Sequence, residues 1–306
     1  MIVCVGESLI DFVPEPPLYR PVAGGCPFNC SVAAARLGAS VRFIGAVSRD
    51  FFGDQIVGAL DANGVDTRWV SRVDRPTTLA FVKKAPDGSA RYAFYADDSA
   101  DRSLGPSDLP NLPDGALLQI GSISLIADPQ SSTILDLVER ERYSRVIVFD
   151  PNIRPTLVGD DADYRVRVGR ALGAATILKT SDEDLSWMFP GMGEDDAVAE
   201  VFARGVRLVL LTRGSSGSAA MTAHHRVSVR SKPTDVADTI GAGDSYMAAA
   251  LAWLDERQIA EPSAVSELSA ADLESLVDLC GRVAAITCSR TGADPPHRAE
   301  LVTADA

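Results

Sequence analysis

The sequence predicts an α/β protein with a mostly parallel sheet between two layers of helices. Short apolar runs rich in β-branched residues alternate with helical patterns along most of the 306 residues. Continuous apolar runs are typical of parallel strands that are buried on both faces. Repeated β-α alternation predicts helices on both sides of such a sheet. The expected strands are residues 2–6, 41–47, 116–120, 145–149, 176–179 and 206–211.

The helices between these strands have recognisable ends. Gly38, Asn63-Gly64 and Gly205 each follow the last residue of a helical pattern, which is the usual place for a left-handed stop. Near the C-terminus, a strand pair is expected around residues 218–229, before two long helices. The expected helices are residues 29–37, 55–62, 130–141, 197–204, 245–257 and 270–288.

One segment interrupts the alternation. Residues 77–84 and 90–95 are two alternating stretches joined by Ala85-Pro86-Asp87-Gly88-Ser89, in which Pro and Asp-Gly favour a turn. This pattern predicts an antiparallel hairpin inserted into the α/β chain. It is consistent with a lid, with an interface strand pair, or with a hairpin that has no functional role.

Composition excludes several classes of protein. Hydrophobic residues are 46% and charged residues 23% of the chain, as in ordinary globular proteins, and the formal net charge is −13. A broad nucleic-acid or anionic-membrane surface needs a cationic footprint, so neither partner is expected. No apolar run approaches the roughly 18 residues of a membrane span, and the N-terminus does not resemble a signal peptide. Five scattered cysteines indicate a reduced, cytoplasmic setting.

The strongest local motif is Asp238-Thr239-Ile240-Gly241-Ala242-Gly243-Asp244-Ser245, directly before a helical run. Small residues at a helix N-terminus leave backbone N–H groups free to bind an anion such as a phosphate. Asp244 would lie among these donors, where a carboxylate could accept a proton from a hydroxyl nucleophile. The alternative is that Asp244 or Ser245 simply caps the helix. No P-loop motif and no Gly-x-Gly-x-x-Gly after the first strand occur.

With Gly24-Gly25-Cys26-Pro27-Phe28-Asn29, this motif resembles the two signatures of the PfkB (ribokinase-like) carbohydrate kinases. The similarity runs nearly end to end, and segments 78–82, 94–95, 100–101 and 121–125 look most like those of bacterial fructokinases. The resemblance implies a three-layer α/β/α core and a single kinase domain over residues 1–306. It also implies a β lid built from about 76–100 with a contribution from about 10–22. Further matching segments are 35–39, 43–45, 50–54, 64–67, 149–154, 212–217 and 289–293.

The resemblance also implies roles for individual residues. Asp244 matches the catalytic base, the amides of Gly241, Ala242 and Gly243 match the anion hole, and Arg154 matches an arginine that faces the phosphates or the substrate. The matching sugar-binding residues are Asp11, Gly24, Gly25, Asn29 and Asp244. The matching nucleotide-binding residues are Ser181, Thr212, Arg213, Gly214, Ser215, Gly217 and Gly243. Asp184 matches a Mg²⁺ position. A monovalent-cation site, with K⁺ as the candidate ion, is matched by Asp238, Ile240, Thr287, Arg290 and Gly292.

Two positions depart from the family pattern. Asp184 is shorter than the glutamate usual in the Asn-x-x-Glu motif. The Mg²⁺ position is therefore less firmly defined by Asp184 than the catalytic base is by Asp244. Gly281 stands where the last long helix is expected to carry an Asn or His towards the nucleotide.

These residues predict an ATP- and Mg²⁺-dependent kinase that phosphorylates a sugar primary hydroxyl, most simply O6 of fructose. One alternative is a sugar-acid kinase for 2-keto-3-deoxygluconate, for which Arg91 and Arg102 could supply a cation near the lid. Another PfkB sugar or nucleoside kinase, or a non-catalytic sugar- or nucleotide-binding regulator, is also consistent with the sequence. An exposed lid edge favours a homodimer.

Overall fold

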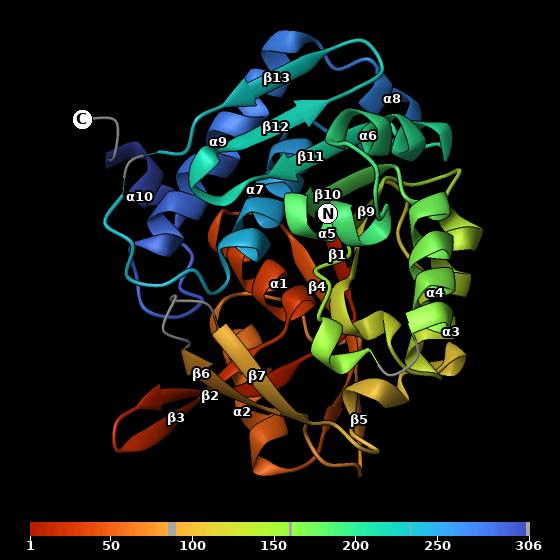
Figure 1. The fold of residues 1–306 in the computed structure, drawn as a ribbon. Helices are drawn as coiled ribbons and strands as arrows, with labels where there is room; N and C mark the ends of the chain where they lie inside the picture. Colours follow the sequence, from red (N-terminus) through yellow and green to blue (C-terminus); the bar gives the residue numbers. More distant parts are fainter. Residues whose placement is uncertain (85–89, 159–160, 233, 304–306) are drawn as a thin grey trace.

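Two β-sheets organise the chain, and the larger one is central. The computed structural model describes residues 1–84, 90–158, 161–232 and 234–303, and within these ranges the large sheet has nine strands (Figure 1). The order is β13-β12-β11-β10-β9-β8-β1-β4-β5, parallel except for the antiparallel β12 and β13. The strands are β1 (Ile2–Val5), β4 (Val41–Ser48), β5 (Val70–Val73), β8 (Leu117–Gly121), β9 (Ile147–Asp150), β10 (Ile177–Ser181), β11 (Leu208–Thr212), β12 (Ser218–Met221) and β13 (Arg226–Val229).

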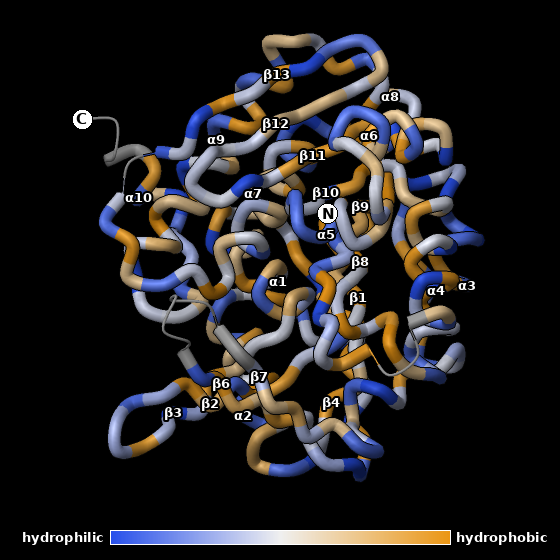
Figure 2. The backbone as a smooth tube through the Cα atoms, viewed as in Figure 1, coloured by the Kyte–Doolittle hydropathy of each residue, from blue (hydrophilic) through white to orange (hydrophobic). Residues whose placement is uncertain are grey.

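Helices cover both faces of this sheet, as the apolar strands require. Along β1, Ile2 and Cys4 pack into one hydrophobic core, while Val3 and Val5 pack into the other. The first core includes side chains of α1 (Cys26–Arg36), α2 (Phe51–Ala62), α7 (Ala242–Glu256), α8 (Pro262–Ser266), α9 (Ala270–Cys288) and α10 (Arg298–Thr303). The second includes side chains of α3 (Gln130–Glu141), α4 (Asp161–Ala174), α5 (Asp182–Met188) and α6 (Glu194–Ala203). Hydrophobic segments accordingly run through the sheet (Figure 2). The expected three-layer α/β core is confirmed.

The small sheet has the order β3-β2-β6-β7, and it lies to one side of the α/β layers (Figure 1). Its strands are β2 (Leu9–Glu15), β3 (Leu18–Gly24), β6 (Leu79–Lys84) and β7 (Ala90–Tyr95). The antiparallel β6–β7 pair confirms the expected hairpin, whose turn at 85–89 lies outside the described residues. Because side chains alternate along a strand, Asp11 and Tyr92 occupy one face and Phe12 and Phe81 the other.

Several boundaries and elements differ from the sequence expectation. Helix α1 begins at Cys26 rather than at 29 because Pro27, which has a φ suited to the first turn, lies inside the helix. Helix α7 begins at Ala242 rather than at 245, with Gly241 left-handed before it. Strand β5 and helix α4 were not predicted. Each position of the four-residue β5 is only partly buried, so its apolar signal is weak.

Short 3₁₀ segments complete the described elements. They are Asp101–Ser103, Pro106–Asp108, Ser122–Leu125, Pro155–Leu157 and Gly214–Ser216. A search of the described helices finds none whose length and apolar character would let it cross a lipid bilayer.

Candidate active site

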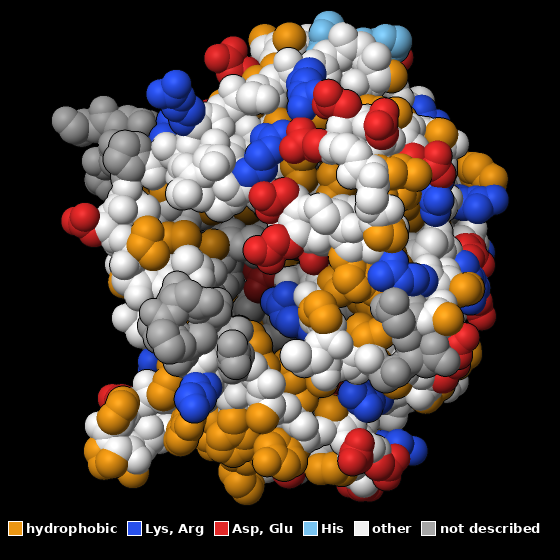
Figure 3. Space-filling model, viewed as in Figure 1, with side chains coloured by type: hydrophobic (Ala, Val, Ile, Leu, Met, Phe, Trp, Pro, Cys, Tyr) orange, Lys and Arg blue, Asp and Glu red, His pale blue; other side chains and the backbone are white. Residues whose placement is uncertain are grey.

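The candidate site lies at the carboxyl edge of the large sheet, where the N-termini of α1 and α7 meet. Glu7 follows β1, Asp150 ends β9, and Lys179 is the central residue of β10, beside Asp150. Open parallel sheets bind ligands at this edge because the strand order leaves a crevice there. The space-filling view shows the molecule hollowed beside the small sheet, with acidic and basic side chains around the hollow (Figure 3). These three charged residues and the first turns of α1 and α7 therefore lie at one edge of the sheet.

Asp244 occupies the first turn of α7 and is buried. Asn29, from the first turn of α1, donates from Nδ2 to Asp244 Oδ2 at 2.8 Å, so that the amide orients the carboxylate. Gly241 has φ +75, and a Cβ there would lie 2.6 Å from Ala293 Cβ, so only glycine fits this turn. The Ala242 amide already donates to Thr239 O at 3.3 Å. A carboxylate at this helix mouth has the geometry of a general base.

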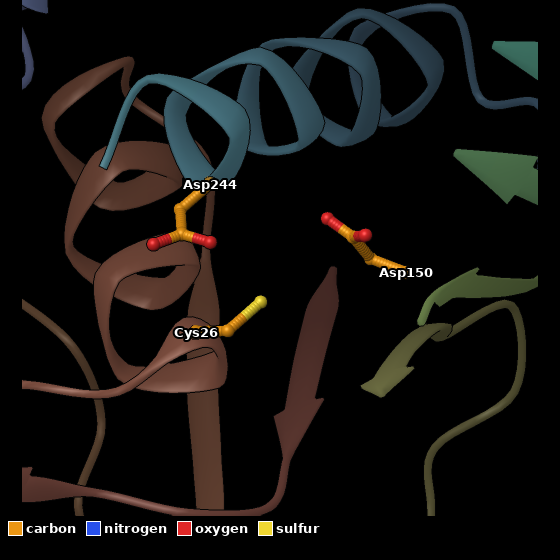
Figure 4. Close-up of side chains that lie close together, drawn as sticks. All are labelled: Cys26, Asp150 and Asp244. Carbon is orange, nitrogen blue, oxygen red and sulfur yellow. The ribbon is translucent and has the colours of Figure 1, made fainter. Parts of the chain in front are cut away.

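A buried group of ionisable side chains lies next to Asp244. One ligand atom from each of Cys26, Asp150 and Asp244 lies within 4.8 Å of the other two, and the three side chains face a common space (Figure 4). Lys179 Nζ donates to Asp150 Oδ2 at 2.8 Å, and both residues are buried. Burial raises the pKa of Asp150 to about 6, although the charge of Lys179 acts to lower it. Burial likewise raises the pKa of the Cys26 thiol well above its usual range, so the thiol stays protonated.

Glu7 is a further buried acid at this edge. Its Oε1 accepts a hydrogen bond from the Cys26 amide at 3.1 Å, and Oε2 accepts from the Ser124 hydroxyl. Burial raises the pKa of Glu7 to about 7. Sequence analysis missed Glu7, Asp150 and Lys179 as site residues. Glu7 and Asp150 are charged residues that follow or end an apolar strand, and Lys179 is a charged residue inside one. Those positions are the signal that could have revealed them.

The small sheet contributes Asp11 from the face that carries Tyr92. Burial, followed by the charge of Asp244, raises the pKa of Asp11 to about 7, and Arg154 acts to lower it. A Cβ at Gly24 would lie 2.4 Å from Asp11 Oδ2, and one at Gly25 would lie 2.9 Å from Glu7 O. The paired glycines therefore make room for the protein's own acidic residues at the site.

Arg154 and Tyr92 bring two different segments to the same place. The Arg154 guanidinium lies 6.0 Å from the centre of the Tyr92 ring, and its Nη1 donates to Ile153 O at 3.2 Å. Burial and the nearby charge of Asp11 raise the pKa of Tyr92 to about 12. Sequence analysis did not single out Tyr92. Its signal is the alternation along β7, which places it on the same face as Asp11.

The Ser181–Asp184 segment shapes the adjoining loop. Ser181 Oγ accepts from the Asp184 amide at 3.0 Å and caps α5. Asp184 Oδ1 accepts from the Ile153 amide at 3.0 Å, so this carboxylate holds the loop that carries Arg154. Its other oxygen remains for a metal-bound water, and hard carboxylate oxygens suit Mg²⁺. The residues present thus fit a water-mediated Mg²⁺ ion.

A pocket of about 560 Å³ adjoins the mouth of α7. The expected nucleotide residues Thr212, Gly214, Ser215, Gly217 and Gly243 line it, together with Gly281. Ser181 and Arg213 are not in its lining. The guanidinium of Arg213 instead pairs with Glu194, at 2.7 Å and 2.9 Å to the two carboxylate oxygens.

The residues expected to hold a monovalent cation lie around one loop. Asp238 Oδ1 accepts from the Thr239 and Ile240 amides at 2.8 Å and 3.2 Å, and Oδ2 accepts from the Gly292 amide at 3.3 Å. The buried Thr287 hydroxyl donates to Ser245 Oγ at 2.9 Å. The Arg290 side chain extends towards Glu300, with which it forms an ion pair, so only its backbone could contribute to such a site.

A carboxylate at a helix mouth, with a pocket on one side and a polar hollow on the other, is an arrangement that suits a phosphotransferase. The family model described as pfkB family carbohydrate kinase matches residues 1–299. The chain belongs to this family, and its enzymes transfer a phosphoryl group to a sugar hydroxyl.

Relatives and solved structures agree with this membership. The chain is 40% identical over 261 residues to a fructokinase of Rhizobium leguminosarum bv. trifolii, covering 83% of this chain and 79% of that one. A Vibrio cholerae fructokinase structure with fructose, ADP and calcium has a TM-score of 0.89 at 25% identity, covering 99% and 97% of the chains. A double-mutant form of that enzyme is described with potassium. A Xylella fastidiosa fructokinase with ATP has a TM-score of 0.89 at 26% identity, covering 99% and 98%.

Proposed function

We propose that this protein transfers the γ-phosphoryl group of ATP to a primary hydroxyl of a sugar, with D-fructose giving fructose 6-phosphate. The observation that carries the proposal is the position of Asp244. It lies between the pocket lined by Thr212 and Gly243 and the polar residues Asp11 and Arg154. The similarity to fructokinases, one of them with fructose bound, favours fructose as the acceptor.

In this proposal Asp244 accepts the proton of the sugar hydroxyl as the oxygen attacks the γ-phosphorus. Asn29 holds the carboxylate in place, and the amides of Gly241–Gly243 and the guanidinium of Arg154 stabilise charge on the phosphoryl oxygens. When bound near Asp184, Mg²⁺ would neutralise the negative charge of the phosphates. Asp11, Asn29 and the backbone at Gly24 and Gly25 would hold the other sugar hydroxyls.

We assign the small sheet the role of a lid over the sugar, built from about residues 76–100 with a contribution from about 10–22. Its Asp11 and Tyr92 face the site and bring polar groups to the substrate. Closure over the sugar would exclude water, which would otherwise compete as the phosphoryl acceptor.

The opposite face of the same sheet supports a homodimer. Phe12 stacks on Phe81 at 4.6 Å, and Tyr95 packs on the edge of Phe81 while remaining 66% exposed. Tyr19 of β3 lies on the same face, packs on the edge of Phe81 and is 48% exposed. Exposed apolar side chains on a sheet are typical of a protein interface. Light scattering should give twice the monomer mass for the native protein, and Tyr19→Glu should lower it.

Two further parts of the proposal concern a monovalent cation and the cellular setting. A monovalent cation, with K⁺ as the candidate, would be held by backbone carbonyls near Asp238 and Gly292, since potassium accompanies one of the similar enzymes. A reduced, cytoplasmic setting remains the expectation from the five cysteines.

Coupled ADP release in the presence of Mg²⁺ tests the proposed reaction. Fructose, ribose, a nucleoside and 2-keto-3-deoxygluconate should be compared at equal concentration, with fructose expected to give the highest kcat/KM. A preference for 2-keto-3-deoxygluconate would replace fructose by a sugar acid, for which Arg102, near the lid, could supply a cation. Sugar binding without turnover of any acceptor would instead favour a regulator.

A further inference from the structure

Lys179 is a buried cation that the roles described above do not use. Its side chain is 6% exposed, and its ion-pair partner Asp150 is completely buried. A buried ion pair contributes little net stability because both charges lose their hydration. Such a pair at the carboxyl edge of a parallel sheet is therefore a candidate functional group.

The ammonium group lies directly against the mouth of α7. A Cβ placed on Gly243 would be 2.9 Å from Lys179 Nζ, so the ammonium touches the backbone where the expected anion hole is formed. Glycine at 243 is the residue that lets the cation approach so closely. A phosphoryl group bound by the Gly241–Gly243 amides would lie next to this nitrogen.

The surroundings explain why a cation is needed there. Glu7, Asp150, Asp184 and Asp244 all lie near this point, and a nucleotide adds further negative charge. The charge of Asp150 outweighs burial and raises the pKa of Lys179, which keeps the ammonium protonated. Asp150 Oδ1 has no hydrogen-bond partner among the described residues, so the carboxylate is not saturated by the protein.

We propose that Lys179 is a catalytic residue of this kinase: its ammonium group contacts the oxygens of the transferred phosphoryl group beside Gly243, and Asp150 is the positioning residue that holds it. This inference rests on the proposed kinase function. The sugar oxygen forms a bond to the γ-phosphorus, the bond between that phosphorus and the β–γ bridging oxygen breaks, and ADP leaves with the electron pair. The hydroxyl proton goes to Asp244, and Lys179 donates hydrogen bonds throughout without losing its proton.

Two variants distinguish a catalytic role of Lys179 from a purely structural one. One removes the cation alone, and the other removes both charges of the ion pair. Lys179→Met leaves Asp150 as an unpaired buried charge, whereas Lys179→Met combined with Asp150→Asn leaves a neutral pair. If Lys179 contacts the phosphoryl group, both variants should lose about 10²- to 10³-fold in kcat. If Lys179 only neutralises Asp150, the double variant should regain wild-type kcat, and that result would overturn the proposal.

A binding measurement decides the proposal independently of the acceptor sugar. Calorimetry with Mg²⁺ should show that the double variant loses about 10-fold in affinity for a non-hydrolysable ATP analogue but little for AMP. Equal affinities of wild type and double variant for the analogue would contradict a contact with the γ-phosphoryl group. Inactivity of the wild-type protein on every sugar would refute the proposed function while leaving this test intact. Thermal unfolding of each variant confirms that the fold is retained.

Asp150→Asn alone tests the positioning role. The Asn side chain keeps an oxygen for Lys179 but not the negative charge. We expect kcat to fall less than in Lys179→Met, while KM for the sugar stays within about twofold, because in this proposal Asp150 acts on the phosphoryl group through Lys179. A rise in KM for the sugar with unchanged kcat would contradict that role.

Discussion

The two ends of the site are lined by different kinds of residue. The pocket proposed for the nucleotide, the nucleotide end, is lined mainly by small residues such as Gly214, Gly217 and Gly281, so backbone and empty space define it. The end proposed for phosphoryl transfer, the transfer end, has buried charged side chains, among them Lys179 and Asp244. A nucleotide brings its own charges and needs mostly shape and backbone donors. Proton and phosphoryl transfer need charges fixed in a dry environment.

This contrast has an electrostatic consequence. Burial raises the pKa of Glu7 and Asp11 to about 7 and that of Asp150 to about 6, all at the transfer end. Among the described residues that line the pocket there is no Asp or Glu. Sensitivity to pH and to conservative substitution should therefore concentrate at the transfer end.

The largest expected effect is that of Asp244→Asn. The amide can still accept the hydrogen bond from Asn29, but it cannot take a proton from the sugar hydroxyl. We expect kcat to fall about 10²- to 10⁴-fold, with nucleotide affinity and unfolding temperature nearly unchanged. Steady-state kinetics with fructose measures the loss. Turnover near that of the wild type would remove the base from the transfer end and break the contrast.

Glu7→Gln should change stability in a pH-dependent way. The folded-state pKa of Glu7 is raised from 4.5 to about 7, so its contribution is fully present below 4.5 and is lost as pH rises through 7. That shift corresponds to roughly 3 kcal/mol of unfolding free energy. Urea unfolding at several pH values should show the difference between wild type and variant growing in favour of Gln from pH 5 to 8.

Ser215→Ala, at the nucleotide end, is the matched control for Glu7→Gln. Its unfolding free energy should follow the wild-type pH dependence, because no shifted acid is removed. An equal pH dependence in Glu7→Gln and wild type would show that Glu7 is not the buried acid responsible.

Asp11→Asn should affect the sugar rather than the nucleotide. The pKa of Asp11 is raised to about 7, and only its ionised carboxylate accepts hydrogen bonds from sugar hydroxyls on both oxygens. The wild-type kcat/KM for fructose should therefore rise as pH increases through about 7, and this inflection should disappear in the variant. The variant should also lose about 10- to 100-fold in kcat/KM. An unchanged inflection would assign the titration to another group.

The sequence predicted the glycine turns and the apolar strands better than it predicted the charged residues of the site. Gly241 and Gly217 were identifiable because glycine patterns report turns and close backbone approaches, and apolar runs reported the strands of the core. Lys179 was placed inside a strand by its apolar neighbours, and its contact with Gly243 depends on two segments distant in sequence. Glu7 and Tyr92 have local signals, a charge after an apolar strand and the alternation along β7, but their closeness to the other site residues depends on pairing across the fold.

Strand β5 and helix α4 illustrate a different limit. Residues 70–73 become a strand by pairing in parallel with the end of β4, a long-range interaction that four partly buried residues do not report. Helix α4 carries charged residues among its apolar ones, and its tertiary packing stabilises it more than its pattern does. The structure of short or mixed segments therefore depends on tertiary contacts that their own residues do not reveal.

The smallest expected effect lies at the nucleotide end, where Gly281→Asn would add a side chain to a surface that lacks one. No heavy atom lies within 4 Å of a Cβ at this position, so the new amide has room in the pocket. One added hydrogen bond should lower KM for ATP about 2- to 10-fold. Gly281→Ala, which gains the same helix propensity without a polar group, is the control. If both variants bind ATP with the same affinity, shape alone governs this end of the site. If only Gly281→Asn binds ATP more tightly, the wild-type protein lacks a side-chain contact with the nucleotide at this position.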